Sequence, residues 1–198
     1  IPFVMGVTEK DSADITDIAL HIRGSPNTLG ERVPRSFLYV LQGETPEIYS
    51  KGSGRLRLAE DISAHPIAAR VIVNRVWAWH MGTGIVQSPS NFGFAGSPPT
   101  NPELLEFLAA DFVENGRSIK RLHRQIMLSS VYQLATADNP EYSDVDADND
   151  YYWRFNRQRL DAESIRDALL HISGGLDPKI GGQSLSLDDE KNDRRTLY

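Results

Sequence analysis

The chain has 198 residues, of which 40% are hydrophobic and 24% charged, and its formal net charge is −6. This composition is typical of a globular protein and excludes a disordered, collagen-like or coiled-coil chain. The negative charge argues against nucleic acid as a partner, the absence of cysteine excludes disulfides and thiolate metal sites, and no apolar run is long enough to span a membrane.

The first fifty residues are predicted to be extended. Residues 17–24 alternate apolar with other side chains, which predicts a half-buried strand, and residues 36–41 predict a second one. Residues 43–54 are rich in turn-forming residues. We therefore expect a boundary between an N-terminal β segment (1–50) and a helical domain (51–198). The chain begins without methionine and ends on an extended-looking run, so we expect a C-terminally truncated fragment of a longer protein.

From residue 54 onward the pattern becomes helical. We expect a short helix over 54–64 and a longer one that Pro66 opens and Gly82 ends. A long loop over 85–99 follows. The apolar stripe of the longer helix consists of Ala69, Ile72, Val73, Val76, Trp77 and His80.

Three further helices are predicted. Thr100 and Glu103 fit a capping box for the first, which Gly116 ends. Ser118 is expected to cap the second, and the third covers 161–173. Their expected buried faces are Leu104, Leu105, Leu108 and Phe112, then Ile119, Leu122, His123, Ile126 and Met127, then Ile165, Ala168, Leu169 and Ile172. The fold class is therefore mainly α: about five helices with a small N-terminal β element.

An acidic segment over 138–150 contains six carboxylates and no basic residue. It is either a solvated linker or a cation-binding loop, because Ca²⁺ prefers several converging carboxylate oxygens. The EF-hand pattern fails, since Asn149 stands where glycine is needed and Phe155 where the bidentate Glu is needed. The calcium candidates are Asp144, Asp146, Asp148 and Asp150.

His80 and His123 both lie on apolar helix faces. Each could be a general base, a metal ligand, or a hydrogen-bonded core residue. No His-Glu-x-x-His spacing is present. On the same predicted helix as His80, Asn74 and Arg75 border the apolar stripe next to Trp77. They form either a groove for a polar or anionic ligand or a structural tie between helix and loop.

The densest polar segment runs from Trp153 to Asp167. It predicts an internal salt-bridge network that pairs Arg159 with Glu163 and Glu163 with Arg166, an anion cradle with an aromatic wall, or an acid–base pair made by Glu163 and Asp167 one helical turn apart. The candidate ligand-binding residues of this segment are Arg154, Asn156, Arg157, Arg159 and Arg166.

Several short motifs occur in order along the chain: Arg55-Leu56-x-Leu58-Ala59-Glu60, Val73-Asn74-Arg75-Val76-Trp77, Gly82-x-Gly84-Ile85-Val86, Ser90-Asn91-Phe92-Gly93, Pro99-Thr100-x-Pro102-Glu103-Leu104-Leu105, Ser118-Ile119-Lys120-Arg121-Leu122-His123 and Trp153-Arg154-x-Asn156-Arg157-x-Arg159-Leu160-x-Ala162-Glu163-x-Ile165-Arg166-Asp167-Ala168. Together they resemble a bacterial domain family of unknown function, numbered 1553, over residues 52–182.

The resemblance implies a context rather than an activity. Such domains occur in large exported proteins of planctomycetes and related bacteria, often beside a c-type cytochrome domain, in genomes rich in sulfatases and polysaccharide-degrading enzymes. It therefore implies a periplasmic or extracellular location. Any haem would lie in a neighbouring domain, because this chain has no cysteine.

Three functional hypotheses follow. The first is an accessory module that binds an anionic carbohydrate or a partner domain of the same polypeptide, through Asn74, Arg75, Trp77 and the arginines of 154–166. The second is a hydrolytic or redox enzyme acting on polysaccharide, with Glu163, Asp167 and His80 as acid–base groups. The third is a structural domain in which the same arginines are internally paired and hold a haem-bearing neighbour. Exposed, unpaired arginines favour the first hypothesis, and a closed network favours the third.

Overall fold

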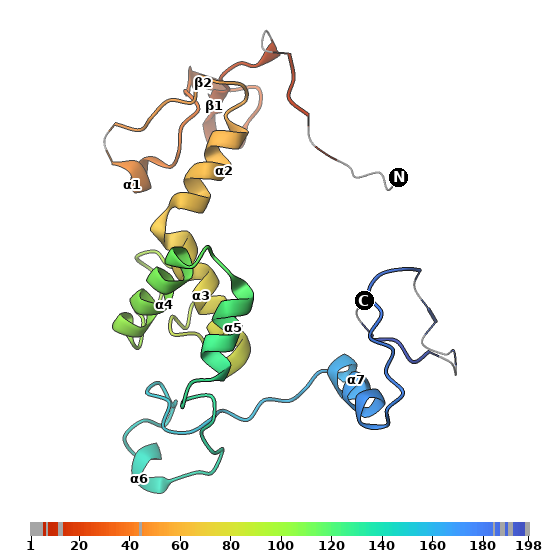
Figure 1. Cartoon of the computed structure of the whole chain (residues 1–198). Helices are drawn as coiled ribbons and strands as arrows, with labels where there is room; N and C mark the ends of the chain where they lie inside the picture. The colour runs from red at the N-terminus through yellow and green to blue at the C-terminus, as the bar shows by residue number, and fades with distance from the viewer. Residues whose placement is uncertain are drawn as a thin grey trace. The chain divides into compact units, whose positions relative to one another are not determined.

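A computed structural model describes residues 6, 8–11, 14–43, 45–183, 185–186, 189 and 192–196. This part of the chain is mainly helical, with seven α-helices, five of them longer than one turn, and a two-stranded sheet near the N-terminus (Figure 1). The predicted fold class is confirmed. The chain divides into two compact units, Ile1–Ser129 and Ser130–Tyr198. The expected division near residue 50 stays a prediction and falls inside the first unit.

The small sheet pairs β1 (Ala19–His21) with β2 (Leu29–Arg32) in antiparallel fashion. The predicted strand over 17–24 is confirmed only in its centre, because the 3-10 turn η2 (Ile22–Gly24) ends the extended run. The second predicted strand, over 36–41, is wrong. Ser36 forms an isolated bridge with Ile48, and Tyr39–Gln42 forms the short helix α1. An unbroken apolar run does not distinguish a strand from a helical turn.

The helices α2 (Arg55–Ala64) and α3 (Pro66–Met81) match the prediction. Between them, His65 caps α3 by accepting a hydrogen bond from the Ile67 amide at 3.2 Å. Pro66 occupies the first turn, where its missing N–H costs nothing. Gly82 ends α3 with a φ of 85°, a left-handed conformation that favours glycine.

The helix α4 (Pro102–Glu114) begins one residue later than the predicted capping box implies. The cap is Asn101, whose side chain accepts from the Leu104 amide at 3.0 Å. Thr100 instead binds the start of the preceding loop, where its amide donates to the Ile85 carbonyl at 2.8 Å. The Thr100–Glu103 capping box is therefore wrong, because a neighbouring Asn next to Pro102 takes the capping position.

The helix α5 (Ile119–Met127) is capped as predicted, since the Ser118 hydroxyl accepts from the Arg121 amide. α3, α4 and α5 pack side by side (Figure 1). Two ion pairs tie them at the surface: Arg70 to Glu106 between α3 and α4, and Arg121 to Asp111 between α5 and α4. The core between these helices consists of Ala69, Val73, Val76, Trp77, Met81, Leu105, Leu108, Ala109, Phe112, Leu122 and Ile126, with Ile85 and Val86 from the following loop.

The second unit contains α6 (Pro140–Ser143) and α7 (Ala162–Ile172). Asp161 caps α7, and Gly174 follows its end with a φ of 75°. None of the helices in the described ranges is both long enough and apolar enough to cross a membrane.

The predicted inward face of α7 is wrong within this unit. Leu169 and Ile172 are 64% and 81% exposed, and Ile165 and Ala168 are exposed as well. The half-buried face carries Arg166, Asp167 and Leu170 instead. The polar side chains of this face bind backbone groups of residues 192–196. This face of α7 is therefore buried by hydrogen bonding and not by apolar packing.

Candidate anion-binding site

The acidic segment of the second unit folds into a turn around Asp146. Its two carboxylate oxygens accept hydrogen bonds from the amides of Asp150 and Tyr151, each at 2.9 Å. Its carbonyl accepts from the Trp153 indole N–H at 2.9 Å. The carboxylate of Asp146 therefore stabilises the loop that leads into Trp153.

Asn149 fixes the next part of this loop from inside. Its side chain is buried, and its backbone lies in the left-handed region with a φ of 59°, which asparagine tolerates better than most residues. Its amide nitrogen donates to the Arg154 carbonyl at 2.9 Å and to the Asn156 side-chain oxygen at 3.1 Å. Its amide oxygen accepts from the Arg154 N–H at 3.3 Å. The loop is therefore held in one shape by a buried carboxamide.

Residues 153–159, which we call the arginine loop, present three guanidinium groups. Arg154 lies over the Trp153 ring, with its guanidinium carbon 4.8 Å from the ring centroid. Its Nε is buried and has no hydrogen-bond partner. Arg157 makes one long hydrogen bond, at 3.5 Å, to the Thr136 carbonyl, and Arg159 is exposed.

The three guanidinium groups of the arginine loop form no ion pair with a carboxylate in the described part of the chain. None of Arg154, Arg157 and Arg159 takes part in an ion pair there, so the predicted Arg159–Glu163 pair does not form, and neither does the predicted Glu163–Arg166 pair. Glu163 lies exposed in the first turn of α7. Three positive charges thus lie close in sequence without neutralising carboxylates.

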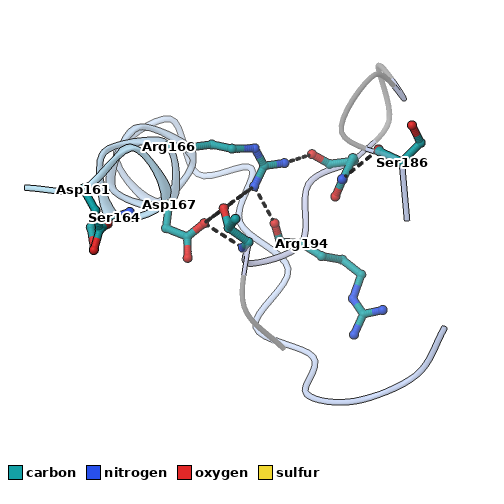
Figure 2. Close-up of polar contacts among 8 residues, drawn as sticks. Asp161, Ser164, Arg166, Asp167, Ser186 and Arg194 are labelled. Atoms are coloured by element: carbon teal, nitrogen blue, oxygen red, sulfur yellow. Dashed lines mark hydrogen bonds and ion pairs between the residues drawn. The ribbon is translucent and has the colours of Figure 1, made fainter. Parts of the chain in front are cut away.

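Arg166 and Asp167 behave differently, because they bind the backbone of the C-terminal segment (Figure 2). Arg166 donates to the carbonyls of Arg194 and Asn192, at 2.8 and 2.6 Å. Asp167 accepts from the amide and the hydroxyl of Thr196, both at 2.9 Å. The predicted ligand residue Arg166 and the predicted acid–base residue Asp167 are therefore parts of an internal network.

Arg194 is a buried member of this network and is not among the site residues predicted from the sequence. Its guanidinium donates to the carbonyls of Lys179 and Gly181, and its backbone pairs with Asp177 in an isolated parallel bridge. The turn-forming Gly181-Gly182 pair was the available signal, because a glycine turn exposes carbonyls that an arginine fork can reach.

Asn74 and Trp77 lie in the core of the first unit. The prediction that Asn74 borders the core is wrong: its exposed fraction is 0%, and its amide nitrogen donates to the Val86 carbonyl at 2.9 Å while its oxygen accepts from the Val86 amide at 2.8 Å. Trp77 is also buried, whereas Arg75 is exposed. A polar cleft formed jointly by these three residues is therefore not present in the first unit.

His80 and His123 lie in contact, although nothing in the sequence predicts that they pair. The His80 Nε2 and the His123 Nδ1 are 2.6 Å apart, and burial lowers the pKa of His80, with the neighbouring His123 as a second cause. The calcium candidates Asp144, Asp146, Asp148 and Asp150 do not converge. Among the residues with described positions, no group of three or more His, Cys, Asp or Glu side chains is arranged to hold a metal ion.

Comparison with known proteins identifies the family but no activity. No curated protein and no solved structure matches the chain. Residues 54–198 match the family described as "PSD1: Protein of unknown function (DUF1553)". This match covers well over half of the chain and includes both α3 and the arginine loop. The chain therefore belongs to the PSD1 (DUF1553) family.

Proposed function

We propose that this chain is an extracytoplasmic accessory module that binds an anionic ligand through the arginine loop, and that the ligand class is sulfated polysaccharide. The observation that carries the proposal is the set of three guanidinium groups, from Arg154, Arg157 and Arg159, without a carboxylate partner among the described residues. Like charges gathered in one loop repel one another, and a bound anion would relieve that repulsion.

The three arginines lack ion pairs within the described ranges even though the second unit is rich in acidic residues. From residue 130 onward the chain has 14 acidic and 8 basic residues, so the second unit has the whole negative excess of the protein. Six of these acids precede the arginine loop, yet none forms an ion pair with it in the described structure. The acids and the arginines are therefore kept apart by the fold rather than paired.

The chemistry of arginine favours an oxyanion with planar or tetrahedral oxygens. A guanidinium presents its donors as a fork that matches carboxylate, phosphate and sulfate, and it stacks on aromatic rings. Arg154 already lies against Trp153, which restricts its rotamers before a ligand arrives. Because the Asn149 side chain binds both the backbone N–H and the carbonyl of Arg154, the loop is pre-organised, and this lowers the entropic cost of binding.

The wider setting that we propose rests on the family resemblance. Membership of this family supports a place in a large exported protein, with a c-type cytochrome domain as a neighbour in the same polypeptide. Any haem would then be bound by that neighbour. Sulfated polysaccharide is the anionic ligand class that fits both the guanidinium chemistry and this setting.

Titration with a sulfated galactan oligosaccharide tests the proposal, with its desulfated form, sodium sulfate and calcium chloride as comparison ligands. We expect saturable binding of the sulfated form, and a loss of affinity of about tenfold or more for Arg157→Gln or Arg159→Gln, since a charged hydrogen bond contributes about 1.5–3 kcal/mol. Arg124→Gln on α5 is the matched control, because it removes the same charge from an exposed site outside the loop. Equal weakening by the control would overturn the proposal, as would equal binding of the desulfated form.

A structural role is the second candidate, and it is favoured by one observation. Arg166, Asp167 and Arg194 form a closed network around the segment 192–196. This network has the features expected of the third hypothesis, in which arginines hold the domain together. It concerns α7 and the C-terminal segment and leaves the arginine loop available for a ligand.

A further inference from the structure

The chain has a second candidate site in its first unit, where two imidazole rings meet. His80 lies in the last turn of α3 and His123 in the middle of α5. Their facing nitrogens, Nε2 of His80 and Nδ1 of His123, are 2.6 Å apart, and the rings meet edge to face with centroids 4.9 Å apart. We infer that these two histidines form a binding site for a divalent transition metal, with water in the remaining coordination positions.

The donor set fits this class of metal. Neutral imidazole nitrogen is a preferred ligand of Zn²⁺, Ni²⁺ and Cu²⁺ and a poor one for Ca²⁺ or Mg²⁺. The two nitrogens approach one another from different helices, so a single ion between them would be chelated. A metal–nitrogen bond of about 2.1 Å requires the nitrogens to move apart by less than about 1 Å, which small rotations of the two side chains can supply.

The packing around the pair holds both ligands in place. α3 and α5 are in direct contact, and Trp77, Leu122 and Ile126, each within four residues of one of the histidines, are buried. Both imidazoles are half-buried, so solvent reaches the site and can complete the coordination. The helix positions limit how far the rings can separate, which pre-organises the chelate.

Two electrostatic features of the site act on an ion. His80 lies at the C-terminal end of α3, where the partial negative charge of the last carbonyls favours a cation. Lys120 and Arg124 on α5 flank His123 and oppose a cation, so we expect moderate rather than tight binding.

The test is a titration of untagged, chelator-treated protein with ZnCl₂ and NiCl₂, followed by calorimetry and by thermal unfolding. We expect one equivalent of metal to bind and to raise the melting temperature. His80→Gln and His123→Gln should each weaken binding at least tenfold. His171→Gln, which changes an exposed histidine of α7, should bind as the wild type does. An absence of binding by the wild type, or unchanged binding by the His80→Gln variant, would overturn the inference.

A measurement on the wild-type protein makes the test independent of how well the variants fold. One equivalent of Cu²⁺ is added, and electron paramagnetic resonance reports the nitrogen nuclei coupled to the ion. Coupling to two imidazole nitrogens supports the paired site. Coupling to one or none means that the copper binds elsewhere and contradicts it.

Discussion

The side chain of Asn74 and the backbone of Val86 form a closed pair of hydrogen bonds inside the core. The amide of Asn74 donates to the Val86 carbonyl and accepts from the Val86 N–H, at 2.9 and 2.8 Å. The side chain of a helix residue thus pairs with both the N–H and the carbonyl of Val86, as a neighbouring strand would do in a sheet. The loop that follows α3 is fixed to the helix it has just left.

We predict that Asn74→Ala destabilises the protein by about 2–4 kcal/mol, because it leaves two buried backbone groups of Val86 without partners. Denaturant unfolding measures this as a lower midpoint at an unchanged slope. Asn115→Ala, which removes an exposed amide at the end of α4, is the control and should cost less than about 1 kcal/mol. A similar cost for both substitutions would contradict the role of the Asn74–Val86 pair.

Gly84 is predicted to tolerate no side chain. A Cβ at this position would lie 2.7 Å from the Val86 carbonyl oxygen and 2.8 Å from the amide nitrogen of Asn74. We expect Gly84→Ala to cost about 1–3 kcal/mol, since the contacted atoms belong to the backbone and to the Asn74 side chain, which two hydrogen bonds hold in place. Gly175→Ala provides the comparison, because its Cβ would meet only Ser173 at 3.6 Å. Equal melting temperatures for the two variants would refute this prediction.

The ion pair between α3 and α4 predicts a small acid-dependent loss of stability. Hydrogen bonds from Arg70 lower the pKa of Glu106 below its ordinary value. A carboxylate whose pKa is lower in the folded state contributes stability above its unfolded pKa, near 4.5, and loses that contribution as the pH falls through the folded pKa. Because both side chains are partly exposed, we expect less than about 1 kcal/mol.

Glu106→Gln tests this prediction when the free energy of unfolding is measured between pH 7 and pH 3. The variant should be slightly less stable than the wild type at pH 7, and the difference should shrink as the pH falls below about 4.5. The same comparison in Arg70→Gln should give the same trend. A difference that grows toward acid pH has the opposite sign and is incompatible with this ion pair.

The network of α7 predicts that Arg166 orders the C-terminal segment. Arg166→Ala removes the donors to the carbonyls of Arg194 and Asn192, so hydrogen exchange at the amides of Asp177 and Thr196 should accelerate. Amides inside α5 should exchange at unchanged rates, since that helix lies in the other unit. Arg159→Ala is a matched control with no role in this network. Unchanged protection of Asp177 and Thr196 in the Arg166→Ala variant would show that the network does not order the segment.

The predictions that succeeded depend on signals that are local in the sequence. Pro66 and Gly82 mark the ends of α3 because one has a fixed φ and no N–H, and the other adopts a positive φ. Ser118 caps α5 through its own hydroxyl. Such effects act within one turn, so the residues themselves suffice to place the helices.

The failed predictions for Asn74 and for the buried face of α7 concern contacts with segments that fold back against the helix. The angular position of Asn74 places it beside the apolar stripe, but only the path of the following loop places Val86 against it. The periodicity of α7 marks an apolar face, whereas the partner is a backbone segment that Arg166 and Asp167 bind. The meeting of His80 and His123 depends likewise on how α3 and α5 pack.

Two attachments close the loop between α3 and α4 at its base. Asn74 holds Val86 at one end, and the Thr100 amide binds the Ile85 carbonyl at the other. Residues 87–99 therefore leave and re-enter the helical core at one fixed point. Such a segment can be exchanged for another of different length, because the entropy of loop closure changes slowly with length. It is a place in the first unit where a foreign peptide or a reporter label could be inserted while the three packed helices stay folded.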